Sequence, residues 1–160
     1  MRVLITGGYG FIGAWIIRTL LARGDDVFVF DLKEDPRRLR LILPEADVAK
    51  VTFLQGDVTD LPALTAALLT QRVTHVIHLA GLQVPTCRVD PMLGAKVNVL
   101  GTLAVFEAIL PVVVAPHDAA SEHDSVYLHG FIMFEGAGQH VGAVAVTKEV
   151  DLGGGVGILG

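Results

Sequence analysis

Cysteine is almost missing from this sequence, since Cys87 is the only one among 160 residues. No intramolecular disulfide and no cysteine-based zinc site can therefore form within the chain. Such a composition suits a reducing compartment, and we expect a cytoplasmic protein. We interpret Cys87 itself as a small apolar side chain that fills space in the core.

Basic charge is also scarce, because 12 lysines and arginines stand against 17 acidic residues and leave a net charge of -5. This balance gives no reason to expect nucleic acid or an anionic membrane as a partner. Long apolar runs are lacking too: residues 14–22 are interrupted by Arg18 and fall far short of a bilayer span. Residues 3–5 are too short for a signal peptide. We therefore expect no targeting segment and no membrane partner.

Hydrophobic residues are plentiful, at 52% of the chain, which is enough for a well-packed core in one domain. Short, continuous apolar runs alternate with helical patterns along the first two thirds of the sequence. This order predicts an α/β fold with a Rossmann-type, doubly wound parallel sheet covered on both faces. The expected strands are residues 3–6, 27–30, 51–54, 76–79 and 112–114; the expected helices are 11–23, 61–70 and 91–109, with a short helix within 33–45.

The pattern changes after residue 115, where glycine becomes frequent and only residues 131–134 and 141–146 look like strands. We therefore divide the chain into a Rossmann domain, residues 1–115, and a divergent glycine-rich tail, residues 116–160. Completion of the sheet by this tail stays open. Its histidines match no helical i, i+4 pair, so we interpret them as scattered loop residues and expect no metal site. These histidines are His117, His123, His129 and His140.

The first expected strand and helix are joined by a turn with a glycine at every third position, Thr6-Gly-Gly-Tyr-Gly-Phe-Ile-Gly13. Gly7 permits the tight turn, Gly10 lets a pyrophosphate approach the backbone, and Gly13 lets the helix pack close to the strand. Free N–H groups around Phe11 and Ile12, at the start of the helix, then face the phosphates. The pattern predicts a dinucleotide site, and a purely structural turn is the alternative.

An acidic residue ends the second expected strand, since Asp31 follows the apolar run of residues 27–30. A carboxylate at this position can accept hydrogen bonds from the adenosine ribose hydroxyls, and it repels a 2′-phosphate. Asp31 therefore predicts NAD as the cofactor rather than NADP. Arg37 and Arg38 are close enough in sequence to keep NADP open.

Five motifs occur in one order: TGGYGFIG (residues 6–13), Asp31, GDVTD (56–60), HLAG (78–81) and VNVLGT (97–102). As a set they resemble the extended short-chain dehydrogenase/reductase family, in its subgroup of NAD-dependent epimerases and dehydratases that act on sugar nucleotides. The resemblance covers residues 1–110. It implies an adenine contact by Asp57 and Val58, and a lining of the nicotinamide half by Leu79, Ala80 and Gly81. It also implies that Asn98 lies near the active site.

Structural roles compete with these functional ones. Asp57 can simply cap a turn, a histidine on an apolar strand such as His78 is more often packed in the core, and Asn98 can bond the backbone alone. We favour the functional role for Asp57 and structural roles for His78 and Asn98.

The catalytic part of the family pattern is missing. Relatives use a Tyr-x-x-x-Lys pair with a nearby serine or threonine, in which the lysine lowers the pKa of the tyrosine. The segment VAVTKE, residues 144–149, is similar to this motif but has Val144 in place of the tyrosine. The catalytic residues are therefore unknown, and Lys148, Tyr127 and Ser125 are weak candidates whose spacing does not match the motif.

The sequence thus predicts the NAD(H)-binding domain of an epimerase/dehydratase-like protein, truncated or divergent, whose full-length relatives act on nucleotide sugars by transient hydride transfer. The alternative is an inactive NAD-binding sensor or interaction module. A third explanation is a tail that arose by frameshift or engineering.

The expected helix of residues 91–109 is apolar on two sides, which predicts two packing partners. The sheet is one of them, and a second copy of the chain in a homodimer, or the tail, is the other. The two stripes are Leu93, Val97, Leu100 and Ala104, and Met92, Ala95, Val99, Leu103 and Phe106.

Overall fold

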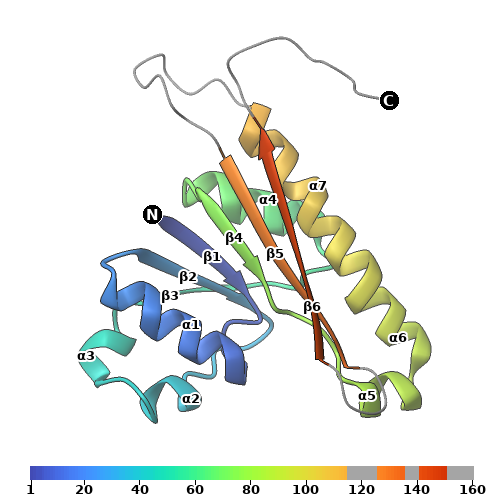
Figure 1. Ribbon diagram of the computed structural model, residues 1–160, viewed down its shortest axis with the longest axis horizontal. Coiled ribbons are helices and arrows are strands. Elements are labelled where there is room, and N and C mark those ends of the chain that lie inside the picture. The colour runs from blue at the N-terminus through green and yellow to red at the C-terminus, as the bar shows by residue number, and fades with distance from the viewer. Residues whose placement is uncertain (115–125, 136–140, 151–160) are drawn as a thin grey trace.

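The computed structural model describes residues 1–114, 126–135 and 141–150, and the side chains of residues 1–110. One six-stranded sheet in the order β3-β2-β1-β4-β5-β6 runs through the molecule (Figure 1). Neighbouring strands from β3 to β5 are parallel, and β6 pairs antiparallel with β5. The Rossmann-type sheet expected from the sequence is confirmed. The strands are β1 (Arg2–Thr6), β2 (Asp26–Asp31), β3 (Thr52–Gln55), β4 (His75–His78), β5 (Val126–Glu135) and β6 (Val141–Val150).

Helices cover both faces of the sheet, as the continuous apolar strands predict. On β1, Val3 and Ile5 pack into one core with Ile17 of α1, whereas Leu4 packs into the other core. That second core contains Leu64 of α4 and Val105 of α7. The helical elements are α1 (Phe11–Ala22), α2 (Arg37–Arg40), α3 (Glu45–Val48), α4 (Leu61–Thr70), α5 (Val84–Val89), α6 (Pro91–Ala95), the π-helix η1 (Lys96–Leu100) and α7 (Gly101–Val114).

The expected strand at residues 112–114 is wrong, because α7 continues through these residues to Val114. β-Branched residues lower helix propensity by only tenths of a kcal/mol each, and extending an existing helix needs no new nucleation. The strand that pairs with β4 is instead β5, at residues 126–135. The strand-like runs at 131–134 and 141–146 are present as parts of the longer β5 and β6.

The helical run Pro91–Leu110 is long and apolar enough to cross a membrane by length and composition alone. In this structure it lies within the connection between β4 and β5, packed beside α4 (Figure 1). Val105, Ala108 and Ile109 lie in the core of that face of the sheet. A core helix of a soluble α/β protein passes the same length and composition test, so the run is weak evidence for a membrane span.

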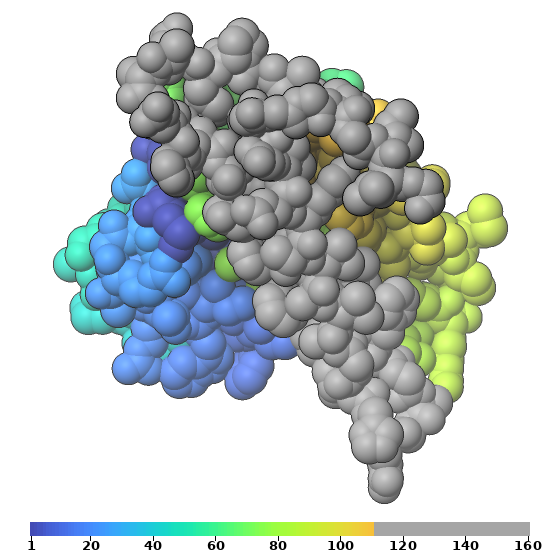
Figure 2. Space-filling view, turned by 45° about the horizontal axis from the view of Figure 1, so that its top comes forward, coloured from blue at the N-terminus to red at the C-terminus, as the bar shows by residue number. Residues whose placement is uncertain are grey.

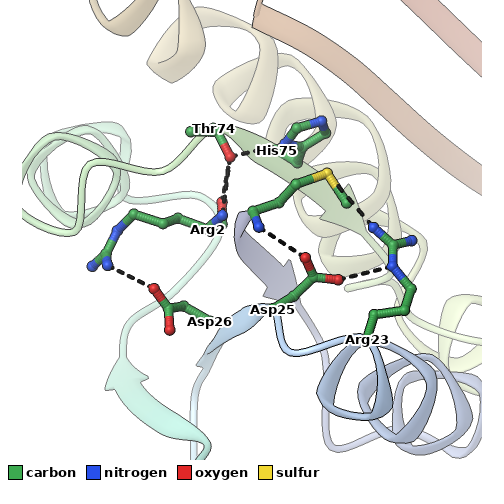
Figure 3. Close-up of polar contacts among 7 residues, drawn as sticks. Arg2, Arg23, Asp25, Asp26, Thr74 and His75 are labelled. Atoms are coloured by element: carbon green, nitrogen blue, oxygen red, sulfur yellow. Dashed lines mark hydrogen bonds and ion pairs between the residues drawn. The ribbon is translucent and has the colours of Figure 1, made fainter.

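Ion pairs tie together the edge of the sheet where β1 and β2 begin (Figure 3). Asp25 is buried, and its carboxylate lies 2.8 Å from the amino group of Met1 and 3.1 Å from Nε of Arg23. Arg2 pairs with the exposed Asp26 at 2.8 Å. The opposite, carboxyl edge of the strands holds the glycine turn and the acid of β2, and the candidate site lies there.

Candidate cofactor site at the carboxyl edge of the sheet

The glycine turn between β1 and α1 is closely packed against neighbouring backbone. Gly7 has a φ of +67°, and a Cβ at this residue would lie 2.7 Å from the backbone nitrogen of Ala80. A Cβ at Gly13 would overlap the carbonyl of Gly8, which shows how closely α1 packs on the turn. At Gly10 the nearest atom to such a Cβ is the Gly7 carbonyl oxygen, at 3.2 Å. Gly7 and Gly13 are thus fixed by close backbone contacts.

The amino end of α1 is left without a compensating side chain. Gly10 is the N-cap, it offers no side-chain hydrogen bond, and the first turn of the helix holds no acid. Phe11 and Ile12 are exposed. The first N–H groups of a helix carry partial positive charge and bind anions such as phosphates when nothing else satisfies them.

Asp31 lies directly beside this turn. The backbone N–H of Gly7 donates to the carbonyl of Phe30 at 3.0 Å, so the end of β2 is held against the glycine turn. Asp31 is half-buried, and burial raises the pKa of its carboxyl group. Its Oδ1 atom accepts a hydrogen bond from the N–H of Leu32 at 2.8 Å. A carboxylate is therefore placed next to the free helix terminus, as a ribose acceptor must be.

The two arginines after β2 are engaged with other groups. Arg37 donates from Nε and Nη2 to the two carboxylate oxygens of Asp35, at 2.6 Å each, and Asp35 thereby has its pKa lowered to about 2. Arg38 donates from Nη1 to the carbonyl of Tyr9 at 3.2 Å. Both arginines that kept NADP open in the sequence thus have a partner within the protein.

Asp57 forms the turn after β3. Its Oδ1 accepts the backbone N–H and the hydroxyl of Thr59, both at 2.9 Å. The turn-capping role is therefore present, and a ligand contact stays a prediction. Val58 is buried in the core, and a Cβ at Gly101 would lie 2.9 Å from its Cγ2 atom. Any adenine contact by Val58 belongs to its backbone.

The segment after β4 lies over the glycine turn. Leu79 and Ala80 are half-buried and Gly81 is exposed. The side chain of Asn98 on η1 bonds both backbone groups of Leu82, the residue that follows Gly81. Its Oδ1 accepts the Leu82 N–H at 2.7 Å, and its Nδ2 donates to the Leu82 carbonyl at 2.9 Å. Asn98 thus bonds the backbone, as the structural alternative expected, and it does so at the edge of the candidate site.

His78 is a core histidine with both ring nitrogens paired. Its Nδ1 lies 2.6 Å from the hydroxyl of Thr6, and its Nε2 lies 3.1 Å from the hydroxyl of Thr102. Burial lowers the pKa of His78 to about 4, so the ring is neutral near pH 7.

Sequence reasoning did not single out three residues that shape this edge. Thr6 accepts the N–H groups of Leu79 and Ala80 on its hydroxyl. Gly8 leaves no space for a Cβ beside Val29, and Thr102 bonds His78. Thr6 and Gly8 stand inside the glycine motif and carry a local signal. Thr102 is the last residue of the VNVLGT motif, but its partner His78 is 24 residues away, so the motif alone does not assign its role.

The weak catalytic candidates do not meet at this edge. Tyr127 pairs with His75, at the start of β4, and Lys148 pairs with Leu128 on β5. Both register positions belong to the amino side of β4, whereas the glycine turn is at the carboxyl side. Residues 144–149 lie on strand β6, so a helical tyrosine–lysine spacing does not apply to them. Ser125 lies outside the described residues.

Among the described residues, no group of three or more histidine, cysteine or acidic side chains is placed so that it could hold a metal ion. Of the tail histidines, His129 lies on β5, and His117, His123 and His140 lie outside the described part of the chain.

Comparison with known proteins shows which family this chain resembles. Residues 4–120 match the family model described as GDP-mannose 4,6 dehydratase. A UDP-glucose 4-epimerase of Erwinia amylovora is 37% identical over 109 residues, which cover 67% of this chain and 32% of that protein. A UDP-glucose 4-epimerase of Klebsiella pneumoniae is 34% identical over 111 residues, covering 68% of this chain and 80% of that protein.

Among solved structures, the UDP-glucose 4-epimerase of Thermus thermophilus in complex with NAD superposes with a TM-score of 0.59 at 37% identity. The superposition covers 70% of this chain and 34% of that one. The chain thus spans about a third of the length of the Erwinia and Thermus proteins. The chain belongs to the epimerase/dehydratase group of the extended short-chain dehydrogenase/reductase family, of which it represents the nucleotide-binding segment.

Proposed function

We propose that this chain binds NAD(H) at the carboxyl edge of its sheet, as the cofactor-binding part of a protein of the nucleotide-sugar epimerase/dehydratase type. The pyrophosphate lies against Gly10, which has no side chain and whose own N–H donates to the Gly7 carbonyl at 3.0 Å. The N–H groups of Phe11, Ile12 and Gly13 bind it, and the adenosine ribose bonds Asp31. Asp57 and the backbone of Val58 border the adenine. Leu79, Ala80 and Gly81 line the nicotinamide half.

One observation carries this proposal: the uncapped amino end of α1 and the carboxylate of Asp31 lie side by side on the glycine turn. A structural turn needs Gly7 and Gly13 only. It does not need an unpaired helix terminus beside a half-buried acid, whereas a dinucleotide uses both. The Thermus structure, which contains NAD, has the same fold over this segment and supports the choice of cofactor.

Isothermal calorimetry with NAD and NADP tests the proposal directly. We expect NAD to bind more tightly, and Asp31→Ala to weaken NAD by about tenfold to a hundredfold, because one or two charge-assisted hydrogen bonds are lost. Asp26→Ala is the matched control, since Asp26 is an exposed acid at the other end of the same strand. Equal affinity for the two cofactors, or equal effects of the two substitutions, would contradict the proposal.

A second copy of the chain is our proposal for the open face of the helical run Pro91–Leu110. Part of this run lies at the surface in Figure 2, in yellow-green to yellow. Several of its apolar side chains are exposed. Leu103 is 57% exposed, while Val105 two residues on is buried. A helix with a buried face and an apolar exposed face is typical of a two-fold interface. The exposed side chains are Met92, Leu93, Val99, Leu100, Leu103 and Leu110.

A nucleotide sugar is the proposed substrate class of the complete proteins to which this segment corresponds. We also propose a cytoplasmic protein without nucleic-acid or membrane partners, on the strength of the net charge of -5 and the single cysteine.

A further inference from the structure

A chain of hydrogen bonds crosses from the sheet to the helix layer just beneath the candidate cofactor site. It runs from the hydroxyl of Thr6 on β1, through the ring of His78 on β4, to the hydroxyl of Thr102 on α7. All three residues are buried, with His78 only 5% exposed. Burial makes each of these bonds costly to lose, because water cannot replace the missing partner.

The direction of each proton in this chain follows from counting donors. The Thr102 hydroxyl donates its one hydrogen to the carbonyl of Asn98, at 2.7 Å. That carbonyl can only accept and is nearer to the hydroxyl than Nε2, so we assign the hydroxyl hydrogen to it and the proton of the neutral ring to Nε2. The Nδ1 atom of His78 is then an acceptor, and the Thr6 hydroxyl must donate to it.

The same hydroxyl of Thr6 accepts from two backbone groups of the site. These are the N–H of Ala80 at 3.3 Å and the N–H of Leu79 at 3.2 Å. The Leu79 N–H also donates to the backbone carbonyl of Thr6 at 3.0 Å, so its bond to the hydroxyl is the longer branch of a bifurcated bond. With one hydrogen donated to His78 and two accepted, the oxygen of Thr6 has no capacity left. Every hydrogen bond from Ala80 to Asn98 is thus polarised in one direction.

Hydrogen bonds of this series and of Asn98 hold both ends of residues 79–82, which lie over the glycine turn. At one end, Ala80 is so close to Gly7 that a Cβ on Gly7 would lie 2.7 Å from its nitrogen. At the other end, the side chain of Asn98 binds the backbone of Leu82. The backbone carbonyl of the same Asn98 is the last acceptor in the series of hydrogen bonds. His78 thus orients the Thr6 hydroxyl that receives Ala80 at one end of residues 79–82, while the Asn98 side chain holds the other end.

We propose that His78 is a positioning residue for the cofactor, whose Nε2–H tautomer, set by Thr102, holds residues 79–82 in the arrangement that binds the nicotinamide half of NAD. This inference rests on the proposed NAD(H) binding. Thr102 acts through His78, and neither side chain contacts the dinucleotide.

Nitrogen-15 NMR of the histidine rings tests the proton direction without any cofactor. We expect His78 to show the Nε2–H tautomer at pH 7, with its signal assigned by its loss in His78→Asn. In Thr102→Val, which keeps the shape but removes the acceptor, we expect a mixture of tautomers. Thr102→Ser should restore the Nε2–H form. An Nδ1–H ring in the unsubstituted protein overturns the proposal, even if Thr102→Val fails to fold.

Calorimetry then separates positioning from stability. We expect Thr102→Val to weaken NAD binding about tenfold, the effect of one buried hydrogen bond, and Thr102→Ser to bind normally. Val105→Ala is the matched control, since it opens a cavity in the same helix without touching the chain of hydrogen bonds. It should lower the melting temperature and leave NAD affinity unchanged. Equal losses of affinity in Thr102→Val and Val105→Ala, or no loss in either, contradict the positioning role. If the unsubstituted protein shows the Nε2–H tautomer but does not bind NAD, the result contradicts the proposed function and not the assigned direction of the hydrogen bonds.

Discussion

At the scale of single residues, the site depends on positions where one added atom or one moved proton changes the outcome. Gly7 and Gly24 both have positive φ, at +67° and +82°, but their surroundings differ. A Cβ at Gly7 meets Ala80, whereas a Cβ at Gly24 meets nothing within 4 Å. The pair therefore separates backbone strain from steric overlap within one protein.

Replacement of each of these glycines by alanine gives our first residue-scale prediction. Gly24→Ala should cost about 1 kcal/mol of unfolding free energy, because it introduces strain alone. Gly7→Ala should cost about 2–4 kcal/mol and abolish NAD binding, since residues 79 and 80 must move. Urea unfolding and calorimetry measure both effects. Similar losses of stability in the two variants would show that the contact with Ala80 is unimportant.

The pH dependence of stability reports on His78. Its pKa is lowered by burial from 6.5 to about 4, so the unfolded chain binds a proton at a pH where the folded chain does not. Stability contributed by the neutral ring is therefore complete above pH 6.5 and is lost as the pH falls towards 4. Between pH 7 and pH 5 we expect about 2 kcal/mol of unfolding free energy to be lost through this group. His78→Asn should remove that part of the slope, and parallel curves for the two proteins would contradict the prediction.

Sequence reasoning reached the residues of the glycine turn because their constraints are local. Gly7, Gly13 and Asp31 act on neighbours that the strand–turn–helix pattern already places beside them. The partners of His78 are 72 and 24 residues away, and the pattern of an apolar strand identifies the ring only as buried. The direction of its protons also depends on a contact from Thr102 to Asn98, which is local to one helical run but matters only because the fold places His78 beside Thr102.

At the scale of elements, the helical run Pro91–Leu110 connects the site with the outer surface of the molecule. Its middle turn, η1, is a π-helix, which places Asn98 against Leu82 and brings Thr102 beneath His78. Such turns occur frequently at functional sites. The sequence predicted one continuous helix here, because a π-turn has no distinctive composition. Likewise, β-branched residues suggested a strand at 112–114, where helix extension prevailed.

A charge on the exposed face of this helix tests the proposed homodimer. We expect light scattering to show a dimer of the unsubstituted chain at micromolar concentration, and a monomer for Leu103→Glu, because the charge would be buried in the interface. Leu41→Glu is the control, since Leu41 is 83% exposed and lies at the end of α2, outside this helical run. It should leave the dimer intact. A monomeric unsubstituted chain would favour coverage of this face by the tail.

At the scale of the whole molecule, the two edges of the sheet have different tasks. The edge where the strands begin is closed by ion pairs, with the buried Asp25 between the Met1 amino group and Arg23 (Figure 3). The edge where the strands end leaves a helix terminus and a carboxylate open, as expected for ligand binding at the carboxyl ends of parallel strands. The order of strands and helices was predictable from periodicity, which sets this asymmetry. The pairing of β6 with β5 was not, because its composition carries no directional signal.

This asymmetry predicts that the chain by itself binds NAD without converting a nucleotide sugar. Hydride transfer from a sugar hydroxyl needs a base whose pKa lies near the working pH. Tyr9, within the glycine turn, has its pKa raised to about 12 by burial and by the acids around it, so it holds its proton. Tyr127, the only other tyrosine, pairs with the start of β4, on the amino side of the sheet. The positioning of a substrate contributes roughly 7–11 kcal/mol in effective enzymes. It also needs residues of the relatives that lie outside the third of their length matched by this chain.

Incubation with NAD and a panel of nucleotide sugars, followed by NADH absorbance and chromatography, should therefore show no turnover while NAD remains bound. Turnover that disappears in Lys148→Ala would prove that the chain assembles a base which neither edge of the sheet reveals.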